Sequence, residues 1–502
     1  RDRMGEKPLY YGWQGDAFLF GSELKAFLQH PAWVGGVNRN SLAKLLQYNY
    51  IPSPQTIYHN IFQVQPGEMV KLSFQNNAWN LEASNWWSLS ENFQKGKDNL
   101  FQGNRNDAVD ELELILKEVL SEQQLADVPV GAFLSGGIDS SAVVSVLQSV
   151  SSQPINSFTI GSFNPDYDES TKAREIAKQL NVNHTEYKVD VKDVVNLIPQ
   201  IPNIYDEPFA DASQIPTILI SRLAKQKVTV AISGDGGDEI FGGYNRYIVA
   251  PRLFSWLEGK PLFLRRLARN MITSISPQLW DMINFSSSHQ LGEKAHKISK
   301  LLDAKSEWEI YSRLIKIWHE SIPVLGYGID SDISYNFENE DRFSYLDKAG
   351  SFSEKMMLAD AATYLPDDIL VKVDRAAMNS SLETRVPLLD YRVVSFASTL
   401  PLDMKIYNGE SKWILRQLID RYLPRSLVNY PKSGFAIPLH EWLRGPLRDW
   451  AESLLNLNRL EQEGFFDPLP IRKLWNEHLS GKFNHQYALW SVLMFQAWLE
   501  LQ

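Results

Sequence analysis

The chain has 502 residues, which is more than one hydrophobic core usually organises, so we expect two or three domains. It contains no cysteine, and this excludes disulfides, thiolate metal sites and a cysteine nucleophile within these residues. The net charge of −10 gives no basic footprint for nucleic acid, and the sequence has no apolar run of membrane-spanning length, so we expect a cytoplasmic protein that acts on small molecules without nucleic-acid or membrane partners.

Residues 1–93 favour short strands and loops. They are rich in β-branched and aromatic residues, and turn signals such as Ile51-Pro52-Ser53-Pro54 and Gln65-Pro66-Gly67 interrupt them. The stretch 94–106 is polar and contains two glycines and three asparagines. We therefore predict a linker at 94–106 and a second large unit at 107–502.

From residue 107 onward, helical spacing alternates with short apolar runs. Apolar runs at 128–134, 157–160 and 228–232 predict strands, and helical spacing follows the first two. This alternation indicates an α/β fold, a parallel sheet with helices on both faces, followed by a mostly helical C-terminal part. Such sheets bind ligands beyond the carboxyl ends of their strands. The first helical stripe comprises Leu112, Ile115, Leu116, Val119 and Leu120.

The loop after the first of these strands predicts a phosphate cradle. It lies where a strand leads into a helix, so free backbone N–H groups can hold an anion. Paired glycines let the backbone approach phosphate oxygens, serine hydroxyls add donors, and an aspartate can hold Mg²⁺. A Gly-Ser turn that only caps a helix is the alternative. The loop reads Leu134-Ser135-Gly136-Gly137-Ile138-Asp139-Ser140-Ser141.

A second cluster, Ser233 to Tyr244, follows the apolar run 228–232. Its three carboxylates, among several glycines, would be a solvated turn if the cluster stood alone. Because two polar clusters follow strands of one predicted sheet, we expect a shared site. The three acids are Asp235, Asp238 and Glu239.

These two clusters resemble those of the ATP-pyrophosphatase superfamily and, within it, of the asparagine synthetase family. The resemblance implies that ATP and Mg²⁺ activate the side-chain carboxylate of aspartate as an acyl-adenylate, that pyrophosphate leaves, and that ammonia then displaces AMP to give asparagine. Activation of another carboxylate in a polysaccharide or secondary-metabolite pathway stays open, as do a non-catalytic nucleotide-binding relative and a homodimer. Other segments that match the family are 206–211, 365–375, 383–390, 411–416 and 430–435.

The resemblance also implies roles for single residues. Asp139 and Asp238 would hold magnesium, Lys432 would place a charge near the α-phosphate, and Asp235, a shorter acid than glutamate, would serve the acyl-adenylate and the incoming amine. The predicted adenosine contacts are Leu134, Ile160, Ser233 and Gly234, and Ser135, Gly136, Gly137, Ser140 and Ser141 complete the ATP cradle. Four further charged residues belong either to the site or to structural ion pairs: Asp374, Arg385, Lys412 and Arg416.

Segments 1–11 and 22–26 are similar to the later part of a class II glutamine amidotransferase domain. That domain uses an N-terminal cysteine to release ammonia from glutamine. We expect residues 1–93 to be its C-terminal remnant, and we favour truncation of a glutamine-dependent enzyme over a natural ammonia-dependent form or one served by a separate glutaminase. The chain alone should use free ammonia.

Overall fold

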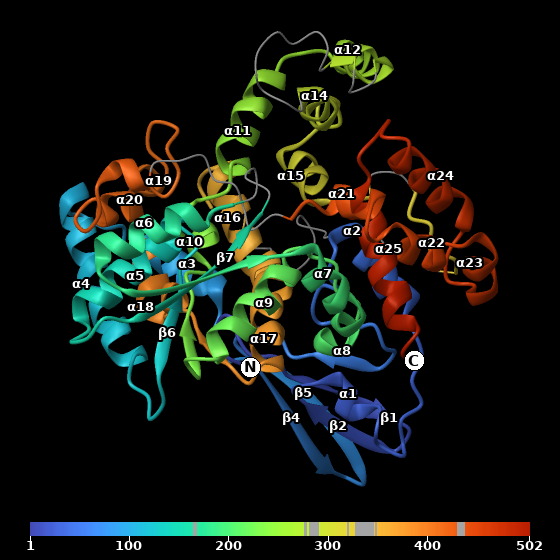
Figure 1. Cartoon of the computed structure of the whole chain (residues 1–502), viewed down its shortest axis with the longest axis horizontal. Coiled ribbons are helices and arrows are strands. Elements are labelled where there is room, and N and C mark those ends of the chain that lie inside the picture. Colours follow the sequence, from blue (N-terminus) through green and yellow to red (C-terminus); the bar gives the residue numbers. More distant parts are fainter. Residues whose placement is uncertain are drawn as a thin grey trace.

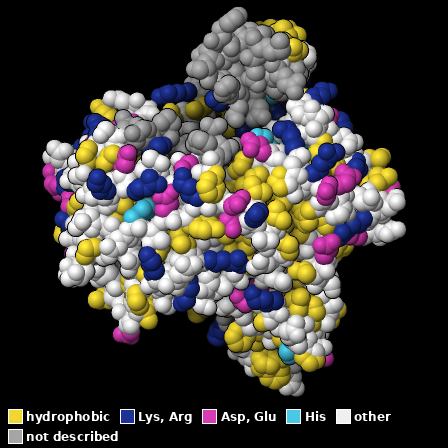
Figure 2. Space-filling model, viewed as in Figure 1, with side chains coloured by type: hydrophobic (Ala, Val, Ile, Leu, Met, Phe, Trp, Pro, Cys, Tyr) yellow, Lys and Arg dark blue, Asp and Glu magenta, His cyan; other side chains and the backbone are white. Residues whose placement is uncertain are grey.

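The computed structural model describes residues 1–163, 168–275, 279–280, 291–318, 321–326, 346, 349–428 and 437–502. The N-terminal strands lie at one end of the molecule, and helices surround a central sheet (Figure 1). On the face in Figure 2, basic and acidic side chains are interspersed. None of the helices in the described ranges combines the length and hydropathy of a transmembrane segment.

The N-terminal region consists of short strands and loops, as predicted. Strand β1 (Tyr10–Gln14) pairs antiparallel with β2 (Ala17–Gly21) and with β3 (Ile61–Gln63). Strands β4 (Glu68–Gln75) and β5 (Ala78–Asn85) form a separate hairpin. Two helices complete the region, α1 (Leu24–Phe27) and α2 (Arg39–Tyr48).

Helix α3 (Leu89–Asp98) extends into the predicted linker at 94–106, and α4 begins at Arg105. Gly96 was interpreted as a sign of flexibility. Instead it lets α3 lie directly against α18 (Tyr391–Thr399), since a Cβ at Gly96 would be 2.5 Å from the backbone of Ser398. Close helix packing, and not a turn, explains this glycine.

The central sheet has five parallel strands in the order β10-β9-β6-β7-β8. The prediction of a parallel α/β sheet is therefore confirmed. Three of its strands coincide with the predicted apolar runs. The strands are β6 (Val130–Phe133), β7 (Asn156–Ser162), β8 (Asn183–Val189), β9 (Val230–Ile232) and β10 (Glu383–Arg385).

Helices cover both faces of this sheet (Figure 1). On one face, α4 (Arg105–Gln123), α5 (Ile138–Val150) and α6 (Ser170–Leu180) share a core with Ala132 and Ile232. On the other face, α9 (Gln214–Lys225) and α17 (Leu370–Asn379) pack on Phe158, Ile160 and Ala231. The carboxyl edge of the sheet thus lies between two sets of helices.

The remaining helices form the outer layer and the C-terminal part. Helix α25 (Gln486–Leu499) buries Trp490 and Trp498 against α2 and the neighbouring C-terminal helices. The others are α7 (Val191–Leu197), α8 (Ile201–Tyr205), α10 (Gly237–Phe241), α11 (Arg246–Leu257), α12 (Leu262–Ser274), α14 (Leu291–Ser299), α15 (Glu307–Ile315), α16 (Phe352–Ala362), α19 (Leu402–Lys405), α20 (Trp413–Ile419), α21 (Leu439–Arg444), α22 (Arg448–Leu454), α23 (Leu457–Glu463) and α24 (Pro468–Leu479).

Candidate active site

The loop between β6 and α5 is held in shape by its own serines. Ser135 donates from its backbone N–H to Ser140 Oγ (3.2 Å), and the two hydroxyls are 3.0 Å apart. Ser135 Oγ also accepts a hydrogen bond from Gly137 N (3.3 Å). The loop therefore enters the N-terminus of α5 as a compact turn, where backbone N–H groups favour a bound anion.

The second loop, after β9, lies directly against the first. A Cβ at Gly234 would be 2.7 Å from Ser140 N, and a Cβ at Gly237 would be 2.3 Å from Asp139 Oδ1. Larger residues at these two glycines would push the loops apart. The glycines of the second cluster thus bring its carboxylates next to Asp139.

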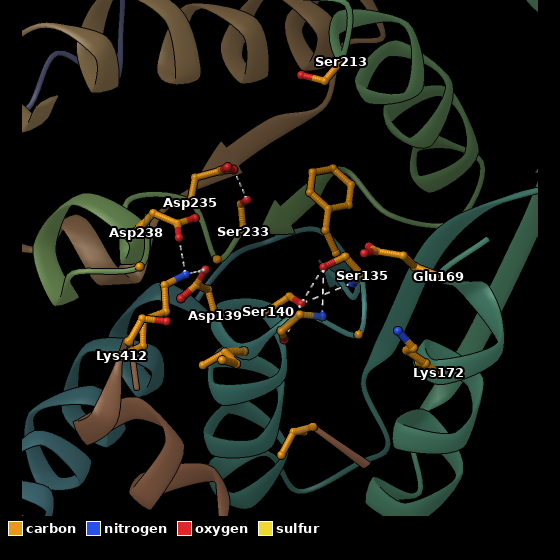
Figure 3. A pocket seen from close by; sticks show the side chains of 18 of the residues that line it. Ser135, Asp139, Ser140, Glu169, Lys172, Ser213, Ser233, Asp235, Asp238 and Lys412 are labelled. Atoms are coloured by element: carbon orange, nitrogen blue, oxygen red, sulfur yellow. Dashed lines mark hydrogen bonds and ion pairs between the residues drawn. The ribbon is translucent and has the colours of Figure 1, made fainter. Parts of the chain in front are cut away.

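Lys412 lies between the two carboxylates that were predicted to hold magnesium (Figure 3). Its Nζ is 2.7 Å from Asp238 Oδ1 and also forms an ion pair with Asp139 Oδ2. Burial lowers the pKa of Lys412, but the charges of Asp139 and Asp238 outweigh burial and raise it. The ammonium is therefore ionised, and the two carboxylates converge on one cation.

This arrangement fits the magnesium assignment. Mg²⁺ is usually bound through one or two carboxylates together with substrate phosphates. Asp139 and Asp238 come from two different strand ends and point at the same place, beside the anion-binding turn of the first loop. The donor set is chemically suited to a hard cation.

A cavity of roughly 680 Å³ opens at this edge of the sheet. Its described lining includes nine of the predicted site residues: Ser135, Gly136, Gly137, Asp139, Ser140, Ser233, Gly234, Asp235 and Asp238. The side chains of Leu134 and Ile160 belong to the two cores of the sheet, and Ser141 is fully buried in α5. Lys432 lies outside the described residues.

Several residues that line the cavity had no predicted role. They are Glu169 and Lys172 at the start of α6, Ser213 directly before α9, Thr217 on α9, and Lys372 on α17. Lys372 lies within the segment 365–375 that resembles the family, but nothing in the sequence assigned a role to this lysine.

Asp235 and Lys372 lie at the end of the cavity formed by α9 and α17. Ser233 Oγ donates a hydrogen bond to Asp235 Oδ2. Lys372 Nζ donates to Asp211 Oδ2 (2.9 Å), and Ser213 Oγ lies 2.8 Å from each oxygen of the same carboxylate. Burial would raise the pKa of Asp211, but the charge of Lys372 and the bonds from Ser213 lower it.

Comparison with known proteins identifies the family. The sequence model for asparagine synthase matches residues 111–500, and that for a glutamine amidotransferase domain matches residues 1–87. The chain belongs to the asparagine synthase family. It is therefore a ligase-type enzyme of a family that makes amides with ATP.

Several curated relatives are similar to the chain over most of its length. The chain is 28% identical to glutamine-hydrolyzing asparagine synthetase 1 of Bacillus subtilis, over 99% of this chain and 74% of the relative. It is 25% identical to asparagine synthetase 3 of the same organism, over 90% and 67%. It is also 24% identical to amidase chry2 of Gibberella zeae, over 97% and 74%.

The four charged residues that the sequence left open divide into two groups. In this synthase-type chain, Arg385 donates to the carbonyls of Gln123 (2.6 Å) and Leu125 (3.0 Å), and Asp374 pairs with Lys7 (2.7 Å). These two are structural. Lys412 and Arg416 line the cavity.

The segment 206–211 joins the amidotransferase-type region to the synthase-type region. Asp206 accepts a hydrogen bond from Leu24 N (2.9 Å) and lies 3.4 Å from Arg375. Glu207 accepts from Ile57 N (2.9 Å), and its burial raises its pKa to about 8. The match to the family in this segment thus reflects contact between the two regions, and Asp211 also holds the cavity residue Lys372.

Proposed function

We propose that the chain activates the side-chain carboxylate of aspartate with ATP, releases pyrophosphate, and joins ammonia to the acyl-adenylate to form asparagine and AMP. The convergence of Asp139, Asp238 and Lys412 beside the glycine-serine turn supports this proposal most strongly. It combines an anion-binding turn with a cation-binding carboxylate pair at the carboxyl edge of a parallel sheet.

Each part of the site has a task in this reaction. The backbone and hydroxyl donors of Ser135 and Ser140 would bind the departing pyrophosphate. Asp139 and Asp238 would hold magnesium, which neutralises charge on the phosphates. Asp235, fixed by Ser233, would lie beside the acyl group and the incoming amine. Lys432 would face the α-phosphate, where a fixed positive charge favours the transition state.

The nitrogen source of this chain would be free ammonia. Glutamine-dependent enzymes of this type release ammonia with a cysteine thiolate, and these residues contain no cysteine. The amidotransferase-type region nevertheless packs against the synthase-type region: Lys7 pairs with Asp374, Lys25 pairs with Asp206, and Arg375 donates to the carbonyl of Ser22. We therefore expect this region to act as a structural partner of the synthase site.

A second substrate class is favoured by one comparison. The relative named amidase chry2 shares 24% identity over 97% of the chain, so similarity over nearly the whole chain extends to a protein with another name. The same activation chemistry on a different carboxylic acid is the alternative function. The second alternative is that the chain binds nucleotide but does not catalyse a reaction.

Product analysis tests the proposal. The purified chain is incubated with ATP, Mg²⁺, aspartate and ammonium chloride, and the products are separated. The proposal predicts asparagine, AMP and pyrophosphate in equal amounts. Formation of ADP and phosphate, or nucleotide binding without products for any of a panel of acids, would contradict it.

A further inference from the structure

The cavity has two ends that lie on opposite faces of the sheet. The glycine-serine turn and Lys172 lie with α5 and α6 on one face, and Ser213 and Lys372 lie with α9 and α17 on the other. Figure 3 shows Ser213 well apart from Ser135 and Ser140 of the turn. The end near Lys372 is thus separate from the predicted phosphate cradle.

Lys372 is a fixed cation at this second end. Its side chain is 11% exposed, and its pair with Asp211 measures 2.9 Å. Asp211 in turn is held by the backbone N–H and hydroxyl of Ser213, each at 2.8 Å. Burial lowers the pKa of Lys372, but Asp211, Asp368 and Asp235 raise it further, so the ammonium is charged at neutral pH.

The other cationic side chains of the described lining are placed for different tasks. Lys412 is enclosed between Asp139 and Asp238, Arg416 donates a hydrogen bond to the carbonyl of Ser411 (2.8 Å), and Lys172 lies on α6 beside the cradle. An ammonium has three N–H donors, and the pair with Asp211 uses one of them. Lys372 can therefore bind a second anionic group that enters the cavity.

We propose that Lys372 binds a second, non-reacting carboxylate of the acid substrate, and that it makes the site specific for dicarboxylic amino acids. This rests on the proposed activation of a carboxylate in the same cavity. With the nucleotide at the cradle end, the acid would extend from Asp235 toward α17. A charge-assisted hydrogen bond from a largely buried ammonium would then anchor the end of the acid that does not react.

A purely structural role for Lys372 is the competing explanation. Its pair with Asp211 joins α17 to the loop before α9 and could serve only to hold these elements together. The two roles differ in how the enzyme treats substrate analogues. A structural lysine affects all acids equally, whereas an anchoring lysine matters only for acids that carry the second carboxylate.

The test combines variants of Lys372 with two substrates, aspartate and 3-aminopropanoate, which is aspartate without its α-carboxylate. Acid-dependent exchange between pyrophosphate and ATP is measured for each pair. In the wild type, kcat/KM for 3-aminopropanoate should be lower by about ten- to hundredfold, the range for a hydrogen bond to a charged group. In Lys372→Met this difference should nearly vanish, through a higher KM for aspartate with an unchanged KM for ATP.

Two further variants make the outcome decisive. Lys372→Arg keeps the charge and should keep most of the difference between the acids, and Lys117→Met, at a side chain on α4 that is 42% exposed, should keep all of it. An undiminished difference in Lys372→Met would overturn the proposal. If Lys372→Met does not fold, Asp211→Asn takes its place. It frees the ammonium from its anchor and should reduce the difference, and an unchanged difference would overturn the proposal.

Failure of the proposed function would be visible separately. If the wild type shows no exchange with any acid, titration calorimetry of aspartate in the presence of ATP and Mg²⁺ replaces the kinetic assay. Binding to the wild type that is lost in Lys372→Met would support the anchoring role without catalysis. Equal binding by both proteins, or binding by neither, would overturn it.

Discussion

Replacing Lys412 by methionine removes the cation between Asp139 and Asp238. The lysine side chain is 4% exposed and contacts both carboxylates, one of them at 2.7 Å. Methionine has nearly the same length, so the change removes the charge while retaining most of the packing. Two partly buried carboxylates would then face each other without a counter-charge.

The expected loss of stability follows from this geometry. Because both carboxylates contact one nitrogen, their oxygens lie roughly 5 Å apart, and at an effective dielectric constant of about 20 their repulsion is about 3 kcal/mol. Breaking a buried ion pair by removing one partner costs about 3–5 kcal/mol in other proteins, so we expect a loss in this range for Lys412→Met. Urea unfolding in the presence of EDTA, followed by tryptophan fluorescence, measures it.

Magnesium provides the second half of this prediction. A divalent cation bound by Asp139 and Asp238 would replace the missing charge, so Mg²⁺ should stabilise Lys412→Met more than the wild type. Lys117, whose side chain is 42% exposed and pairs with Glu113, serves as control, and Lys117→Met should cost less than about 1 kcal/mol. Wild-type stability for Lys412→Met in EDTA, together with no response to Mg²⁺, would refute the reasoning.

Three further changes test other parts of the site. Asp139→Asn and Asp238→Asn should each slow pyrophosphate release by at least about 10²-fold, because several kcal/mol of charge stabilisation are lost; near-normal turnover in both would remove the magnesium assignment. Lys432→Met should lower the rate at saturating ATP more than the affinity for ATP, as quench-flow and binding measurements would show, and the reverse pattern would make Lys432 a binding residue. Burial raises the pKa of Glu207 from its ordinary value of 4.5 to about 8 in the folded chain, so between these pH values the unfolded chain loses a proton that the folded chain keeps. The free energy of unfolding should therefore fall as pH rises from 4.5 to about 8. Glu207→Gln keeps the acceptor for Ile57 N and should flatten this pH dependence in unfolding experiments, whereas an unchanged slope would contradict the shift.

The sheet and its two loops could be predicted because their signals are local. Buried parallel strands appear as continuous apolar runs, and the glycines, serines and acids that follow them are adjacent in sequence. Since all parallel strands end at one edge, the two clusters had to lie near each other. The close approach of Gly237 to Asp139 shows that the two clusters do lie against each other.

Contacts between distant segments could not be predicted in this way. Lys412 is 273 residues from Asp139, and Lys372 is 161 residues from Asp211. A lone lysine has no local signal that separates a buried cation from a solvated one. The family resemblance marked the segments of both lysines, and only the packing of α17 and α20 gave them partners.

Glycine was also ambiguous in the sequence. Gly96 suggested a linker, but a close contact with Ser398 requires it. Composition alone cannot separate a glycine that provides flexibility from one that permits close packing, because both appear in polar helical segments. Arg385 and Asp374 were ambiguous for a related reason, since their partners lie in loops and regions far away in the sequence.

Acid-dependent exchange of labelled pyrophosphate into ATP tests the central claim most directly, because it reports reversible adenylation of a carboxylate without requiring amide formation. With Mg²⁺ and aspartate, the wild type and Asp110→Asn, a variant at an exposed surface aspartate, should exchange at equal rates, and Asp238→Asn should be slower by at least about 10²-fold. The account predicts no exchange when the acid is left out. Exchange that is independent of any acid, or none with aspartate or any other carboxylic acid, would contradict it.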